Sequence, residues 1–253
     1  MIELKAIAII PARFGSTRFP GKPLAKISKK PMIQHVYERV SQARCLSDVI
    51  VATDNSRILE AVRAFGGKVC MTSDNHRSGT DRVAEVARQT KAEIVVNVQG
   101  DEPLIDPGCI DAAVEPFYSG PELMISTLKS LESAGEDFYN PNVVKVATDR
   151  AGYALYFSRS PIPFHQSKAS SSDAEPQTFF KHIGLYVYRR KFLELLPGLN
   201  PSSLEKAEGL EQLRFLENGY RIKVVCYDYQ SVAVDTPADL ERLNEIFAIQ
   251  SNG

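Results

Sequence analysis

Residues 10–24 read IPARFGSTRFPGKPL, and this stretch indicates both the fold and the kind of ligand. The short apolar run AIAII leads into it and is typical of a buried strand. The stretch combines glycines and prolines with Arg13, Arg18 and Lys22, and the chain has no acidic side chain between residues 4 and 37. The first strand therefore ends in a cationic loop.

Outward from this loop, short apolar runs alternate with amphipathic segments through the first half of the chain. Strands are expected at 6–10, 48–54, 68–72 and 93–103, the last ending at Gly100, and helices at 31–40, 56–67 and 80–90. This alternation predicts an α/β fold with a mostly parallel, Rossmann-like sheet flanked by helices.

The second half is richer in strands. The strands are expected at 123–131, 142–149, 153–159, 182–190 and 221–228, and the helices at 208–219 and 236–249, the latter with Thr236 as N-cap and Pro237 at its first position. The segment 165–178 is polar and low in complexity, and it is expected to be a loop. Neither an internal repeat nor a linker is evident, so we expect one domain, 1–253.

Composition excludes several classes of protein. The 253 residues carry a net charge of −1, so the surface as a whole is not built to attract nucleic acid or anionic lipid. No apolar run is long enough to span a bilayer, and the N-terminal run resembles no signal peptide. Four cysteines without a CxxC pair fit a reducing compartment. We therefore expect a cytoplasmic protein.

The cationic loop lies where a parallel α/β sheet binds its ligands, beyond the carboxyl end of a strand. Glycines let backbone N–H groups approach an anion, and arginine and lysine supply the counter-charge. The loop matches neither the Walker pattern nor GxGxxG. We interpret it as a polyphosphate cradle; the alternative is a solvated basic loop, which is the favoured interpretation for Lys26, Lys29 and Lys30.

A resemblance to a known family extends over nearly the whole chain. The motifs that carry it, in order, are IPARFGSTRFPGKPL (10–24), VATD (51–54), GGKVCMT (66–72), SGTDR (78–82), VNVQGDEP (96–103), NPNVVKV (140–146), YALYFSRSPIP (153–163), KHIGLYVYR (181–189), GLEQLRFLENG (209–219) and VDTPADLER (234–242). The sequence resembles the sugar-activating cytidylyltransferases, in particular the 3-deoxy-manno-octulosonate (Kdo) cytidylyltransferase family.

The resemblance implies a reaction and an assembly. It implies Mg²⁺-dependent transfer of the cytidylyl group of CTP to the anomeric hydroxyl of Kdo, which gives CMP-Kdo and pyrophosphate for lipopolysaccharide synthesis. It implies a CTP-binding part at 1–120, a sugar-binding and dimerisation part at 121–230, and a metal-ligand turn and helix at 231–253. It also implies a homodimer, with the strands at 140–190 near the interface.

Two carboxylates are the candidate metal ligands. Asp101 follows a buried strand, and Asp235 lies between an apolar run and a helix start. Mg²⁺ bound to a triphosphate takes one or two carboxylates in addition to phosphate and water oxygens. The resemblance implies Asp101 and Asp235 as these ligands. The alternatives are a turn-forming role for Asp101 and a helix cap for Asp235, and Glu102 is expected to be a structural neighbour.

The resemblance also implies the remaining site residues. The catalytic set is Arg13, Lys22, Asp101 and Asp235. The nucleotide-binding set is Pro11, Ala12, Arg13, Gly15, Ser16, Lys22, Arg77, Ser78 and Gln99, although Ser78 is as well placed to cap a helix. The sugar-binding set is Arg159, His182, Tyr186, Glu211 and Gln212. His182 and Tyr186 are four residues apart, which places them on one face of a strand. His35, His76 and His165 match no catalytic position.

Two rival functions remain at this point. One is a nucleotidyltransferase for another acceptor, such as 8-amino-Kdo, sialic acid or a sugar phosphate, although GDEP at 100–103 resembles the ordinary Kdo form. The other is a catalytically silent nucleotide-binding module, against which Asp101 and Asp235 argue. The sequence names no general base. Nucleic-acid binding is poorly supported, because the basic residues cluster in one short loop.

Overall fold

The structure is a computed structural model that describes residues 5–15, 19–76, 78–166, 177–229 and 233–251. Its strands are β1 (Ala6–Ala12), β2 (Lys26–Ile27), β3 (Lys30–Pro31), β4 (Leu46–Thr53), β5 (Lys68–Met71), β6 (Ile94–Asn97), β7 (Ile125–Ser133), β8 (Lys145–Thr148), β9 (Ala154–Ser158), β10 (Thr178–Arg189) and β11 (Ile222–Cys226). Its α-helices are α1 (Met32–Val40), α2 (Ser56–Ala64), α3 (Gly79–Arg88), α4 (Pro107–Val114), α5 (Pro116–Ser119), α6 (Glu136–Tyr139), α7 (Arg190–Leu195), α8 (Ser203–Glu208), α9 (Gln212–Glu217) and α10 (Pro237–Ser251). Two 3₁₀ turns are η1 (Lys22–Leu24) and η2 (Leu196–Gly198).

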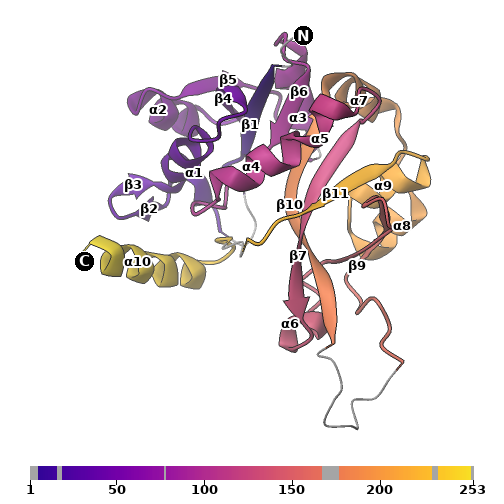
Figure 1. Ribbon diagram of the computed structural model, residues 1–253. Coiled ribbons are helices and arrows are strands. Elements are labelled where there is room, and N and C mark those ends of the chain that lie inside the picture. The colour runs from indigo at the N-terminus through magenta and orange to yellow at the C-terminus, as the bar shows by residue number, and fades with distance from the viewer. Residues whose placement is uncertain (1–4, 16–18, 77, 167–176, 230–232, 252–253) are drawn as a thin grey trace.

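The central sheet is mostly parallel, as predicted. Its strand order is β11-β7-β10-β6-β1-β4-β5 (Figure 1). The strands β6, β1, β4 and β5 pair in parallel, and so do β11 and β7. The exceptions are β10, which runs antiparallel to both β6 and β7, and the antiparallel pair β8–β9, which joins the sheet at β10. The predicted α/β class with helices on both faces is confirmed, and the antiparallel β10 joins its two parallel parts.

Two apolar layers cover the two faces of this sheet. On one face, α1, α2 and α4 bury residues such as Ile33, Val62 and Ile110 against the strands. On the other face, α3, α7 and α9 do the same with residues such as Val83 and Phe215. Burial of these side chains stabilises the fold by about 25 cal/mol for each Å² of apolar surface removed from water. The loops at the carboxyl ends of the strands are thereby held on a rigid support.

Two parts of the chain extend from this core. The strands β7 and β10 continue past the sheet as a twisted ribbon, with α6 at its far end (Figure 1). The helix α10 lies apart from the sheet and packs on the β2–β3 hairpin (Figure 1), where Leu243 and Val234 join Ile27 and Met32 in a small third core. The C-terminal helix is therefore attached to the segment that follows the cationic loop.

The structure differs from the expected elements at several places. The helix expected at 208–219 is shortened to α9, at 212–217, and the preceding α8 was not predicted; α8 ends because Gly209 takes the left-handed conformation with φ of 63°. The strand β6 ends at Asn97 rather than at Gly100, so Gln99 belongs to the loop. The helix α4 was missed, although Asp106 and Pro107 begin it by the same signal that predicted α10. No helix in the described part of the chain is long and apolar enough to cross a bilayer.

Candidate active site

A pocket of about 330 Å³ opens at the carboxyl ends of β1 and β6. Its lining residues are Pro11, Ala12, Arg13, Lys22, Pro23, His76, Ser78, Gly79, Arg82, Gln99, Gly100, Asp101 and Asp235. A volume of this size is typical of a site for a small ligand. The structure thus brings together the predicted Pro11, Ala12, Arg13, Lys22, Ser78, Gln99, Asp101 and Asp235, which the sequence spreads over more than 200 residues.

Glycines shape the floor of this pocket. Gly21 has φ of 72°, and its N–H donates to the Phe14 carbonyl at 2.9 Å, which closes the cationic loop. A non-glycine residue is strained in this conformation. Gly100 lies so close to β1 that an added Cβ would be 3.0 Å from the Pro11 carbonyl oxygen. The ends of β1 and β6 can therefore meet beside η1, which carries Lys22.

Lys22 connects the two carboxylates that were predicted to bind metal. Its Nζ lies 2.6 Å from Asp101 Oδ2 and 3.3 Å from Asp235 Oδ1. The side chain of Lys22 is only 14% exposed, while those of Asp101 and Asp235 are 27% and 46% exposed. The cluster carries two negative charges and one positive charge at an open wall of the pocket. Such a cluster can accept a further cation.

Backbone contacts place Asp235 next to Asp101. The Val234 N–H donates to the Asp101 carbonyl at 2.9 Å. Asp239 Oδ2 accepts from the N–H groups of both Asp235 and Thr236, at 3.0 and 2.8 Å, and Thr236 Oγ1 accepts from the Asp239 N–H at 3.3 Å. The start of α10 is thus capped by Thr236 and Asp239, as expected for Thr236, while Asp235 Oδ1 faces Lys22. This arrangement argues against the cap alternative for Asp235.

The start of α3 joins the nucleotide side of the site to the sugar side. Ser78 is the N-cap of α3, and its hydroxyl accepts from the Asp81 N–H in a capping box, so the capping interpretation of Ser78 is correct. The Thr80 hydroxyl donates to the Glu211 carboxylate. Burial raises the pKa of Glu211, although hydrogen bonds from Thr80 and Ser78 oppose this shift. Glu211 therefore lies against the pocket wall, next to Ser78.

His182 and Tyr186 lie on one face of β10, as predicted, with their ring centroids 5.5 Å apart. His182 Nε2 is 3.0 Å from Thr127 Oγ1. Burial lowers the pKa of His182 from 6.5 to about 3. Burial and the charge of Glu211 raise the pKa of Tyr186 well above 10. Both side chains are therefore uncharged at neutral pH. Tyr186 also pairs in register with Asn97, near the end of β6.

The buried His182 gives a prediction about stability and pH. An unfolded chain binds a proton at this histidine below pH 6.5, whereas the folded protein binds it only near pH 3. The free energy of unfolding of the wild-type protein should therefore fall as the pH drops from 6.5 towards 4. His182→Gln should show a smaller fall over the same range in urea titrations. Equal slopes for the two proteins would contradict the neutral, buried state of His182.

The other predicted residues take different positions. The Arg159 guanidinium donates to the backbone carbonyls of Glu208, Pro141 and Gly209, so its charge is held by the chain itself. Gln212 is buried in the first turn of α9, next to Glu211. These residues do not line the pocket, and their contact with a sugar stays a prediction. Gly15 is exposed in the cationic loop and is not part of the lining. Ser16 and Arg77 lie outside the described residues, as does most of 165–178.

Comparison with known proteins identifies the family. The cytidylyltransferase family model matches residues 7–222. A 3-deoxy-manno-octulosonate cytidylyltransferase of Geobacter sulfurreducens is 58% identical over 245 residues, which are 94% of this chain and 97% of that protein. The chain belongs to the 3-deoxy-manno-octulosonate cytidylyltransferase family. A protein of the same name from Solibacter usitatus is 54% identical and covers 96% of this chain, with 94% of its own length matched.

Solved structures agree with this assignment to the cytidylyltransferases. A CMP:2-keto-3-deoxy-manno-octonic acid synthetase complexed with CTP superimposes with a TM-score of 0.90 at 44% identity, covering 97% of this chain and 99% of that one. A 4-diphosphocytidyl-2C-methyl-D-erythritol synthase from Anaerococcus prevotii gives a TM-score of 0.61 at 13% identity, covering 97% of this chain and 99% of that one. The second likeness shows the shared fold alone.

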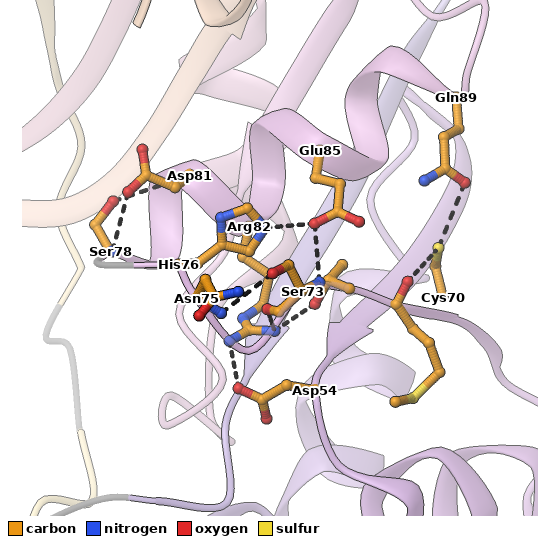
Figure 2. A network of polar contacts seen from close by, with 12 residues as sticks. Asp54, Cys70, Ser73, Asn75, His76, Ser78, Asp81, Arg82, Glu85 and Gln89 are labelled. Atoms are coloured by element: carbon orange, nitrogen blue, oxygen red, sulfur yellow. Dashed lines mark hydrogen bonds and ion pairs between the residues drawn. The ribbon is translucent and has the colours of Figure 1, made fainter. Parts of the chain in front are cut away.

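The sequence did not predict two titratable side chains of the pocket wall of this cytidylyltransferase. Arg82 is buried on α3, and its guanidinium contacts Thr72 and, as Figure 2 shows, Asp54. His76 lies in the loop between β5 and α3, and its Nε2 contacts the Glu85 carboxylate (Figure 2). A signal was present, because Arg82 is the last residue of the SGTDR motif and His76 lies two residues before it. The sequence does not show that the fold turns this loop towards the end of β1.

Proposed function

We propose that the protein transfers the cytidylyl group of CTP to the anomeric hydroxyl of Kdo, which gives CMP-Kdo and pyrophosphate. The observation that carries this proposal is the cluster of Lys22, Asp101 and Asp235 in a pocket at the carboxyl ends of the strands. Relatives at 54–58% identity are named for this enzyme, and the solved structure of similar fold is complexed with CTP.

The chemistry that these residues perform is positioning and neutralisation of charge. The triphosphate would lie along the cationic loop, with Arg13 and Lys22 opposing its negative charge. The anomeric hydroxyl of Kdo would attack the α-phosphorus in line, forming the new P–O bond as the bond to the β-phosphate oxygen breaks. No protein nucleophile is required for this step. Preorganised charges of this kind often supply the largest part of a rate enhancement.

Magnesium is the second part of the proposal, and the donor set fits it. Two carboxylates converge on one point, which the Lys22 contacts at 2.6 and 3.3 Å define. Among the described residues no group of three or more His, Cys, Asp or Glu side chains could hold a metal. Two carboxylates that share a cation with phosphate oxygens are a typical Mg²⁺ site. Asp101 and Asp235 would hold the ion, which when bound neutralises and orients the phosphates.

The sugar would be bound on the other side of the α3 start. Glu211 accepts a hydrogen bond from the Thr80 hydroxyl, and its charge adds to the burial that raises the pKa of Tyr186. Sugar hydroxyl groups require donors and acceptors of this kind. Together with His182, Gln212 and Arg159, these residues are proposed to hold Kdo while Gln99 lies between sugar and nucleotide.

A homodimer is proposed as the working assembly. Large apolar side chains in the second half are more than half exposed, among them Leu155 at 63%, Leu131 at 57% and Tyr139 at 71%. Exposed apolar side chains that gather on one part of a chain are typical of an interface. Light scattering should give twice the chain mass of 28.1 kDa, and a value for one chain would contradict the dimer.

We further propose that the enzyme works in the cytoplasm and that its product is used for lipopolysaccharide synthesis.

The test is pyrophosphate release from CTP and Mg²⁺ with a panel of acceptors. Kdo, 8-amino-Kdo, sialic acid and a sugar phosphate are supplied separately, and one reaction receives no acceptor. We expect release with Kdo that exceeds release with the other acceptors by at least about tenfold in kcat/KM. Faster release with another acceptor would assign a different sugar to the same pocket. No release with any acceptor, despite CTP binding, would favour a silent binding module.

A further inference from the structure

His76 has a defined place on the pocket wall, but neither the proposed reaction nor the family resemblance gives it a role. It lines the pocket next to Ser78 and Gly79, and its side chain is 19% exposed. The loop that carries it is fixed to α3, because Arg82 contacts Thr72 and, as Figure 2 shows, the Ser73 carbonyl. The imidazole is therefore held in place at the pocket wall.

Glu85 determines which edge of the imidazole faces the carboxylate. One oxygen of Glu85, Oε2, contacts His76 Nε2 and also accepts from the Ser73 N–H at 3.0 Å (Figure 2). Burial would raise the pKa of Glu85, but hydrogen bonds from His76 and Ser73 outweigh it, and the pKa is lowered. The carboxylate is ionised at neutral pH and can only accept. His76 Nε2 therefore carries the proton.

In the neutral form of the imidazole, this tautomer leaves Nδ1 as a hydrogen-bond acceptor. In a neutral imidazole one nitrogen donates and the other accepts, and the partner of the first fixes the role of the second. No described residue has a hydrogen bond to His76 Nδ1 among the contacts of this structure. An acceptor repels phosphate oxygens, so this edge does not suit the triphosphate. It suits a ligand group that donates.

We propose that His76 Nδ1 accepts a hydrogen bond from the exocyclic amino group of cytosine, and that Glu85 is the positioning residue that fixes this tautomer. This inference rests on the proposed function, which brings CTP into the pocket. Uracil has a carbonyl oxygen at the position of the amino group, and two acceptors repel each other. The pair His76–Glu85 would thus select CTP over UTP.

The test measures the dissociation constants of CTP and UTP by calorimetry, near pH 8, without a sugar acceptor. His76→Gln keeps an amide that can reach Glu85 but removes the Nδ1 acceptor. We expect its preference for CTP over UTP to fall by about tenfold, the effect of one hydrogen bond and one repulsion. His76→Asn places an amide oxygen near the position of Nδ1, and it should keep most of the preference.

Glu85→Gln tests the positioning role. A glutamine can donate as well as accept, so the imidazole loses its fixed tautomer, and the preference for CTP should again fall. A merely structural role would weaken both nucleotides in the same proportion, and that result would overturn the proposal, as would an unchanged preference in His76→Gln. If the wild-type protein binds neither nucleotide, the proposed function fails together with this inference. If it binds CTP and the variants keep its preference, this inference alone fails.

Discussion

Asp101→Asn is expected to lower kcat for CMP-Kdo formation by about 10³-fold, the effect of removing one charged group from a preorganised site. Asparagine keeps the size of the side chain but removes the negative charge that pairs with Lys22 Nζ at 2.6 Å. The backbone bond from Val234 to the Asp101 carbonyl does not depend on the side chain, so the fold should persist. Initial rates of pyrophosphate release at saturating CTP and Kdo measure the loss.

Two further variants sharpen this result. Asp235→Asn should produce a loss of similar size, because both carboxylates are proposed to hold the same ion. Asp228→Asn is the matched control, because Asp228 is exposed after β11 and does not line the pocket, and it should leave the rate unchanged. Thermal midpoints show whether each variant is folded. A folded Asp101→Asn enzyme with nearly normal turnover would remove Asp101 from the proposed ligand set.

Lys22→Met should lower kcat/KM for CTP by about 10²-fold or more. The substitution keeps the length of the side chain but removes the cation shared by Asp101 and Asp235, which would then repel each other and the triphosphate. Arg82 cannot replace it, because its guanidinium is already paired with Asp54. The larger part of the loss should appear in the binding of CTP, which calorimetry measures directly.

The control for this prediction lies four residues further along. Lys26 is exposed on β2 and does not line the pocket, so Lys26→Met should leave kcat/KM within about twofold of the wild-type value. Lys22→Arg should recover part of the activity, because it restores the charge with a different geometry. If Lys22→Met and Lys26→Met had the same small effect, the triphosphate would not lie on Lys22.

The sequence pattern predicted the helices and strands whose formation depends mainly on neighbouring residues. The apolar run before the cationic loop and the alternation that follows it predicted β1, α1, β4, α2 and β5, because periodicity reports burial directly. Neighbouring residues could not predict the antiparallel direction of β10, since direction depends on the strands beside it. The end of α8 at Gly209 could have been predicted from the sequence, because glycine is the usual residue at a helix end.

The residues of the site also differ in whether the local sequence could predict them. The cationic loop was recognised from its own residues, because glycine, arginine and lysine in one segment indicate an anion site. Asp235 was not recognised from its own residues, because it is 213 residues from Lys22 and reaches it through tertiary contacts such as the bond between Val234 and Asp101. Its role came from the family resemblance. His76 was set aside as a lone histidine, because neither the pocket beside it nor its contact with Glu85 is visible in the sequence.

The most direct test of the central claim follows the phosphorus atoms of CTP. CTP labelled with ³²P at either the α or the γ position is incubated with Mg²⁺ and enzyme, with and without Kdo. We predict that the α label appears in a sugar nucleotide only when Kdo is present, and that the γ label appears only in pyrophosphate. Transfer of the γ label to the sugar, or release of the α label as CMP without any sugar product, would contradict cytidylyl transfer to Kdo.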